Sequence, residues 1–208
     1  MVIILSNIVG GKLTVLFGFE FPAVLYFFPI TFIIGDILTE VYGYVLSKYV
    51  IWSGFIANFL TIAIVAFVGS LPASTHWGLQ DSYNQLFFQS VRISVASCIA
   101  YFGSEFLNAA VLSILKKKTN GRLMLARIVG ASFLSDCLDS IIFCSIGFIG
   151  ALPLSLVIKM MFAQFIVKLV YEVGFSPITC KICKYLKEKE HVDKYDYGVV
   201  YNPFNFRR

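Results

Sequence analysis

Charged residues are scarce in this sequence of 208 residues. Asp, Glu, Lys and Arg make up 14% of it, against about 25% in typical soluble proteins, while 58% of the residues are hydrophobic. The mean hydropathy is +0.80. This balance excludes an ordinary soluble domain, and we expect an all-α membrane protein embedded in a lipid bilayer.

Several functional signatures are also missing. The sequence contains no Walker motif, so it has no nucleotide-binding loop of its own. Cys180 and Cys183 have the spacing of zinc ligands, but no second Cys pair follows them. We therefore expect neither a metal nor a cofactor. The net charge of +5 does not indicate nucleic-acid binding, because the basic residues gather beside the expected membrane spans.

Apolar runs predict six transmembrane helices, each of which needs about 20 residues to cross a bilayer. The expected helices occupy residues 2–17, 23–44, 50–71, 88–115, 123–150 and 154–176. The first of these is the shortest. Because proline favours helix ends, we expect a break at Pro177. This gives a transmembrane domain over residues 1–178 and a charged cytoplasmic tail over residues 179–208.

The distribution of basic residues predicts the orientation. Lys and Arg are absent from the expected loops at residues 18–22, 72–87 and 150–153, whereas the alternate segments carry Lys48, residues 116–118 with Arg122, and the lysines of the tail. Positive charges near membrane spans mark the cytoplasmic side. With an even number of helices, both termini are expected in the cytoplasm.

Two carboxylates interrupt the second apolar run. Asp36 and Glu40 are four residues apart, so they share one face of a helix, close to Phe32. On insertion scales a charged side chain at the bilayer centre costs about 2.5 to 3.5 kcal/mol. We therefore expect this helix face to line a polar interior and not to contact lipid.

Polar side chains recur at helical spacing in three later helices as well. They are Ser94, Ser97, Tyr101, Ser104, Glu105 and Asn108; Ser132, Ser135, Asp136 and Asp139; and Gln164, Lys168 and Glu172. Helix packing explains isolated Ser and Asn residues but not the carboxylates. Lys168, even with Arg92 nearer the outer face, cannot neutralise them all. Some are thus protonated, solvated or available for a ligand, and we expect Arg92, Gln164, Lys168 and Glu172 to serve in charge pairing or gating.

A weak internal similarity aligns residues 32–38 with residues 132–138 and brings Asp36 into register with Asp136. The two expected helices cross the membrane in opposite directions. Two inverted three-helix repeats would produce this relation, which is common in transporters with a binding site near the bilayer midplane. The sequence leaves open whether such repeats exist.

The second apolar run also resembles a known family. Residues 29–44, followed by Lys48, Trp52, Gly54 and Asn58, are similar to the signature of queuosine precursor transporters. Further similar segments are residues 105–108, residues 118–122, Ser135 and Asp136 with Asp139, Lys168 with Glu172 and Pro177, residues 195–196 and residues 202–204. The resemblance implies a secondary carrier of the bacterial inner membrane that imports 7-deazaguanine bases or queuine for tRNA modification, and not an enzyme.

The chemistry of such a substrate selects candidate residues. In a 7-deazaguanine base a ring N–H lies beside an exocyclic amine, and one carboxylate can accept hydrogen bonds from both. Amides can satisfy the ring carbonyl, and aromatic rings can stack on the base. The candidate substrate-binding residues are Phe32, Asp36, Glu40, Asn58, Tyr101, Glu105, Asn108, Asp136 and Asp139. Asp36 or Glu40 is expected to read the pairing edge.

Two alternatives from other classes remain open at this point. The chain could be the substrate-capture subunit of an importer whose ATPase is a separate chain. It could also be an intramembrane enzyme, although Gly35-Asp36 lacks the preceding glycine of intramembrane aspartyl proteases, and Asp136-x-x-Asp139 lacks the Gly and Arg context of lipid phosphotransferases that hold magnesium. The sequence also leaves open whether the chain forms a homodimer.

Overall fold

The computed structural model describes residues 12–16, 19–26, 29–74 and 76–205. Within these ranges the chain is mostly helical, as expected. Its elements are β1 (Leu13–Leu16), β2 (Phe19–Pro22), the 3-10 helix η1 (Ala23–Tyr26), α2 (Pro29–Tyr42), α3 (Tyr44–Ser70), α4 (Gln80–Lys118), α5 (Met124–Phe148) and α6 (Leu154–Glu190).

Four helices in the described ranges are long and apolar enough to cross a membrane. They are Tyr44–Ser70, the Arg92–Lys118 part of α4, Met124–Phe148 and Leu154–Glu190. The fifth α-helix, α2, has 14 residues and falls short of a full span. The chain therefore has the helices of a multi-pass membrane protein, while six spans, inverted repeats and the division at residue 178 stay predictions.

The expected first helix is wrong where the structure describes it. Residues 13–16 form strand β1, which pairs antiparallel with β2 so that Leu13 lies opposite Pro22 and Leu16 opposite Phe19. The β-branched residues Thr14 and Val15 favour this extended conformation. Residues 2–11 of the expected helix lie outside the described residues. The expected turn at 18–22 is likewise a strand over residues 19–22, and α2 begins at Pro29 instead of residue 23.

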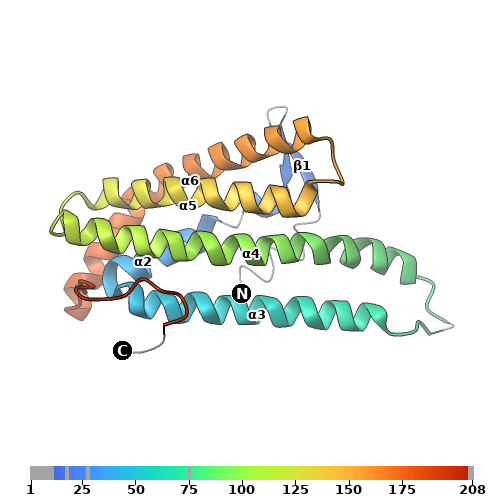
Figure 1. Cartoon of the computed structure of the whole chain (residues 1–208), viewed down its shortest axis with the longest axis horizontal. Helices are drawn as coiled ribbons and strands as arrows, with labels where there is room; N and C mark the ends of the chain where they lie inside the picture. The colour runs from blue at the N-terminus through green and yellow to red at the C-terminus, as the bar shows by residue number, and fades with distance from the viewer. Residues whose placement is uncertain (1–11, 17–18, 27–28, 75, 206–208) are drawn as a thin grey trace.

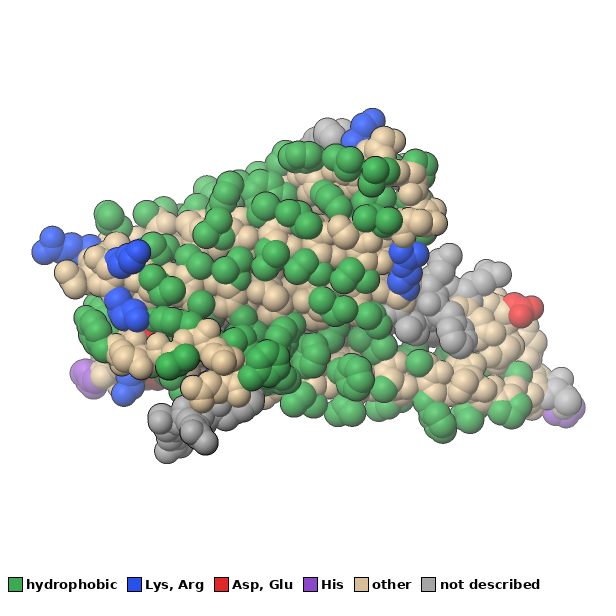
Figure 2. Space-filling model, viewed as in Figure 1, with side chains coloured by type: hydrophobic (Ala, Val, Ile, Leu, Met, Phe, Trp, Pro, Cys, Tyr) green, Lys and Arg blue, Asp and Glu red, His purple; other side chains and the backbone are tan. Residues whose placement is uncertain are grey.

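The long helices lie side by side, with α4 between α3 and α5 (Figure 1), and α6 contacts both α5 and α2. Apolar side chains cover the length of the bundle on the face seen in Figure 2. Two of the most exposed are Phe162 and Val170 of α6, which keep 65% and 66% of their surface accessible. Such an apolar exterior suits contact with lipid.

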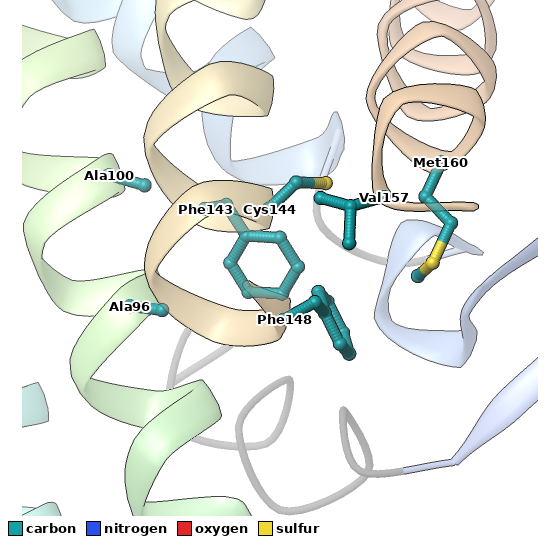
Figure 3. Packing of buried hydrophobic residues seen from close by; sticks show 7 residues of the cluster. All are labelled: Ala96, Ala100, Phe143, Cys144, Phe148, Val157 and Met160. Atoms are coloured by element: carbon teal, nitrogen blue, oxygen red, sulfur yellow. The ribbon is translucent and has the colours of Figure 1, made fainter. Parts of the chain in front are cut away.

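An apolar cluster joins three of these helices near the α5–α6 turn. Ala96 and Ala100 of α4 face Phe143, Cys144 and Phe148 of α5, and Val157 and Met160 of α6 complete the cluster (Figure 3). The small alanine side chains allow α4 to approach α5 closely. This packing fixes the three helices relative to one another at the end of the bundle away from the α4–α5 turn.

Helix α6 continues through Pro177, where we expected a break. Proline lacks the N–H that would bond to the carbonyl oxygen four residues earlier, which here belongs to Val173. The Ser176 hydroxyl donates to that oxygen at 2.9 Å. A neighbouring serine thus satisfies the carbonyl that the proline leaves free, and the helix runs on to Glu190.

The residues after α6 fold back onto the bundle at the end where α4 turns into α5. The backbone N–H of Lys194 donates to the Val41 carbonyl at 3.1 Å, and the Trp52 indole donates to the Pro203 carbonyl at 2.9 Å. The ammonium group of Lys48 donates to the carbonyl of Asn205. The tail therefore covers the ends of α2 and α3.

Candidate functional site

Six carboxyl side chains of the described residues are at most 3% exposed: Glu40, which is treated below, and five others inside the bundle. The five others are Asp36 of α2, Glu105 of α4, Asp136 and Asp139 of α5, and Glu172 of α6. The ammonium group of Lys168, also buried, forms an ion pair with Asp139. We call these five residues and Lys168 the acidic cluster. The expected polar faces of the helices do meet inside the bundle.

Glu105 approaches α2 closely because residue 35 is glycine. A Cβ atom built on Gly35 would lie 2.7 Å from Oε2 of Glu105, which is closer than real Cβ contacts come. Any side chain at this position would have to displace the carboxylate. The Gly35-Asp36 pair therefore makes room for one carboxyl group beside the helix while contributing another.

Hydrogen bonds satisfy only part of the acidic cluster. The Asn108 amide donates to Oδ1 of Asp36 at 2.6 Å, and the Ser104 hydroxyl donates to Oδ1 of Asp139 at 3.3 Å. Other buried oxygens accept no hydrogen bond from any described group: Oδ2 of Asp36, Oε1 of Glu105, Oδ1 of Asn108 and Oε1 of Glu172. Buried acceptors without donors are costly, so they indicate a site that receives a proton or a donor-rich ligand.

A cavity of about 370 Å³ lies between α2, α3 and α4. This volume falls in the range of about 300 to 1,000 Å³ found for small-molecule pockets. Its wall is mostly apolar and consists of Thr31, Ile34, Gly35, Leu38, Thr39, Ser47, Val50, Ile51, Ser53, Gly54, Ala57, Tyr101 and Glu105. Glu105 is the only carboxylate among these lining residues, and it connects the cavity to the acidic cluster.

Glu40 lies in a separate ionic network. Its Oε1 accepts hydrogen bonds from the Arg127 guanidinium and the Lys187 ammonium, both at 2.7 Å. The ammonium of Lys116 donates to the backbone carbonyl of Glu40 at 2.6 Å. We call Glu40, Lys116, Arg127, Lys187 and Asp193 the basic-end network. Asp36 and Glu40 are thus one helical turn apart on α2 but have different surroundings.

Asp193 closes this network from the tail. Its carboxylate forms ion pairs with the ammonium groups of Lys116, at 2.6 Å, and Lys187, at 2.9 Å. Burial alone would raise the pKa of the Asp193 carboxyl, but the hydrogen bonds and charges of the two lysines outweigh it and hold the pKa below its usual value. Asp193 is therefore ionised and ties the tail to α4 and α6.

The remaining candidate residues lie in different parts of the bundle. Asn58 of α3 is fully buried, and Tyr101 is a buried lining residue of the cavity. The Phe32 ring centroid lies 5.2 Å from the Lys168 ammonium. Gln164 accepts a hydrogen bond from the Cys144 thiol at 3.5 Å, near the apolar cluster.

Arg92 lies apart from the acidic cluster. Its exposed guanidinium donates to the carbonyl of Ile146 at 3.0 Å and to that of Ile149 at 2.5 Å. Ile146 belongs to the last turn of α5 and Ile149 directly follows the helix, so both carbonyls lie where a cation is favourable. Arg92 therefore caps a helix at the end away from the tail.

Three residues of the basic-end network, Arg127, Lys187 and Lys116, were not among the site residues expected from the sequence. Arg127 is 2% exposed and belongs to an apolar helix, so its position alone marks it as an intramembrane charge that needs a partner. The sequence therefore contained a signal for Arg127 as a site residue. The partner itself, 87 residues earlier at Glu40, was not recognisable from spacing.

The sequence is similar to those of known transporters. The profile of the family described as "Putative vitamin uptake transporter" matches residues 22–182. A protein of Bacillus subtilis (strain 168) named "Probable queuosine precursor transporter" is 26% identical over 167 residues, which cover 78% of this chain and 72% of that protein. No solved structure matches significantly.

Proposed function

The chain belongs to the vitamin uptake transporter family, and from this premise we propose that it imports a queuosine precursor, either a 7-deazaguanine base or queuine, across a bacterial inner membrane. The name of the Bacillus subtilis relative supports this choice of substrate. Membership of a transporter family makes the chain a transporter and not an enzyme, which removes the intramembrane enzyme considered above.

The observation that carries the proposal is the cavity with Glu105 in its wall. A 7-deazaguanine base offers a ring N–H beside an exocyclic amine, and a carboxylate can accept both. Oε1 of Glu105 accepts no hydrogen bond from the described part of the chain, so it is available to such an edge. The apolar lining supplies the surroundings that a flat ring requires.

Glu105 replaces Asp36 and Glu40 as the proposed reader of the pairing edge. Glu40 already accepts hydrogen bonds from Arg127 and Lys187, and both of these cations would be left partly unpaired if it turned toward a substrate. Asp36 accepts from Asn108 and does not line the cavity. Tyr101, in the same wall as Glu105, is the proposed stacking partner.

Orientation is part of the proposal. Lys and Arg side chains gather at the end of the bundle where α4 turns into α5 (Figure 2), and this end includes Lys116, Lys117, Lys118 and Arg122. Positive charge favours the cytoplasmic side, so the tail and the basic-end network are proposed to face the cytoplasm. With both termini inside, substrate would enter from the opposite end and leave past this network.

Direct binding tests the substrate. Radiolabelled queuine is added to purified protein, and Glu105→Gln is compared with Glu188→Gln, the same change at an exposed position of α6. Glu105→Gln should weaken binding by about 10- to 100-fold, because a hydrogen bond to a charged group is lost. Glu188→Gln should bind like the unchanged protein.

A second ligand shows whether Glu105 recognises the pairing edge of the base or whether the variant has lost its binding site altogether. 7-Deazahypoxanthine lacks the exocyclic amine, so it should bind the unchanged protein weakly and lose little more in Glu105→Gln. Equal queuine affinity in Glu105→Gln would contradict the role of Glu105. If the unchanged protein bound neither queuine nor a 7-deazaguanine base, the proposed substrate class would be contradicted.

Co-purification separates a secondary carrier from the capture subunit of an ATP-driven importer. A secondary carrier should transport queuine when it is reconstituted alone in vesicles. A requirement for a co-purifying ATPase would favour the capture subunit. The same preparation, sized by light scattering, reports whether the chain forms a homodimer.

A further inference from the structure

The carboxyl groups of Asp36 on α2 and Glu172 on α6 lie within hydrogen-bonding reach of one another. Two ionised carboxylates cannot form a hydrogen bond, since both groups only accept. One of the two must carry a proton for this contact to be favourable. The two acids are therefore able to share a single proton.

Buried acceptor atoms around the pair also indicate that a proton is needed there. Asn108 is 1% exposed and donates to Asp36, yet its own amide oxygen Oδ1 accepts no hydrogen bond among the described residues. Oδ2 of Asp36 and Oε1 of Glu172 are in the same situation. Three buried acceptors at the junction of α2, α4 and α6 thus lack a donor.

The titratable groups that face this pair come from α4, α5 and α6. Glu105 belongs to α4, Asp136 and Asp139 to α5, and Lys168 and Cys183 to α6. The charged residue of α3, Lys48, instead contacts the tail at Asn205. Lys168 is paired with Asp139, so no described cation forms an ion pair with Asp36 or Glu172. The pair is therefore buried among further carboxyl groups, with no ion-pair partner among the described residues.

We propose that Asp36 and Glu172 form a proton-binding site, and that the chain couples import of its substrate to the entry of protons. This inference rests on the proposed function and adds its source of energy. One proton would bind to the pair from the outer side and leave to the cytoplasm, with no covalent change in the substrate. The proton site is distinct from Glu105, which lines the cavity.

The position of the pair explains how a proton can act on the bundle. Asp36 and Glu172 belong to two helices that contact one another directly. With the proton bound, the two carboxyl groups hold α2 against α6. Without it they repel, and the helices are driven apart at the level of the acidic cluster. Glu105 sits beside Gly35, so a movement of α2 also changes the cavity wall.

The test uses vesicles that contain the purified full chain and a pH-sensitive dye. In the unchanged protein, addition of queuine should acidify the interior, and an imposed gradient, acidic outside, should accumulate queuine. A protonophore should abolish the accumulation. Exchange of internal for external queuine without any gradient is measured in the same vesicles, and it reports the proposed function alone.

Two variants address the pair. Glu172→Gln and Asp36→Asn should each lose the proton movement that accompanies queuine, whereas Glu188→Gln on the exposed part of α6 should keep it. The number of protons moved per queuine is the decisive readout, since a purely structural role would lower both fluxes together. If a variant does not fold, the response of the unchanged protein to the pH gradient still decides whether transport is coupled to protons.

The outcomes are distinguishable. Queuine exchange without any response to a pH gradient would overturn the proton coupling and leave the proposed function intact. Accumulation driven by a sodium gradient, or only by an added ATPase, would overturn it in the same way. If the unchanged protein exchanged neither queuine nor a 7-deazaguanine base, the proposed function would be overturned, and this inference with it.

Discussion

The carboxylate of Asp196 accepts a hydrogen bond from the backbone N–H of Tyr44 at 2.9 Å. The same oxygen accepts from the Ser113 hydroxyl at 2.5 Å. Tyr44 is the first residue of α3, whose N-terminal N–H groups have no partners within the helix. An acid from the tail thus caps α3 and links it to α4, at the point where α2 ends.

Gly43, between α2 and α3, should not tolerate a side chain. Its backbone has φ of 84° and ψ of 171°, a region essentially restricted to glycine, and a Cβ would lie 2.8 Å from Oδ1 of Asp196. We expect Gly43→Ala to cost about 1 to 3 kcal/mol in backbone strain, and more from the loss of the cap. Thermal unfolding in detergent measures the loss.

Gly150→Ala is the matched control for Gly43→Ala. Gly150 also has φ of 84°, but a Cβ there would meet no atom within 4 Å. It should lose stability through strain alone and should leave the tail in place. Equal losses in the two variants would contradict a role for the Asp196 contact.

Gly35→Ala should impair queuine binding more than it impairs folding. The added methyl group would displace the Glu105 carboxylate, which lies 2.7 Å from the position of the Cβ. Gly174→Ala, on α6, meets nothing within 4 Å and serves as the control. Binding to purified protein is the measurement, with size-exclusion chromatography to confirm the fold. Normal binding by Gly35→Ala would argue against Glu105 as the reader.

The Glu40–Arg127 ion pair should be structural. Both side chains are buried, so removal of one partner leaves an uncompensated charge and should cost about 3 to 5 kcal/mol. Glu40→Gln and Arg127→Gln should each lower the melting temperature strongly, and the double variant should lose less than the sum. Additive losses would show that the two residues act independently.

Asp36 and Glu40 show what helical spacing can and cannot predict. Their separation of four residues correctly indicated a buried polar face, because both are fully buried on α2. It could not show that they belong to different clusters. Their partners come from α4, α5 and α6, and the sequence does not encode the height at which those helices pass α2 in any local pattern.

Lys168 illustrates the same limit. Spacing of four residues places Lys168 near Glu172 on one helix and indicated a role in charge pairing, but the structure shows its partner to be Asp139 on α5. The continuation of α6 through Pro177 was missed for a different reason. Proline is normally a reliable signal for a helix end, and only the contact of Ser176 with the freed carbonyl of Val173 reverses it.

Acid should loosen the tail through Asp193. The folded protein holds the pKa of this carboxyl below its usual value of 3.8, so its contribution to stability is present above that value. The contribution is lost as the pH falls through the lowered pKa. Hydrogen exchange of residues 192–205 should therefore rise below about pH 4. In Asp193→Asn the exchange should already be high at neutral pH; unchanged exchange would refute the link.

Accessibility of introduced cysteines tests the proposed orientation. In a variant without the native cysteines, Ser74→Cys should react with a membrane-impermeant maleimide in intact cells. Asn120→Cys and Glu190→Cys should react only after the membrane is permeabilised, because they lie at the basic end of the bundle. Labelling of Asn120→Cys in intact cells would reverse the orientation.

The return of the tail onto α2 and α3 sets an order of events during synthesis. Residues 193–205 are translated after every helix of the bundle, yet they supply partners to Tyr44, Trp52 and Lys116, which are made much earlier. These groups enter the membrane without those partners. A ribosome that stalls shortly after Glu190 should therefore leave a bundle that is inserted but still open to proteases at its basic end.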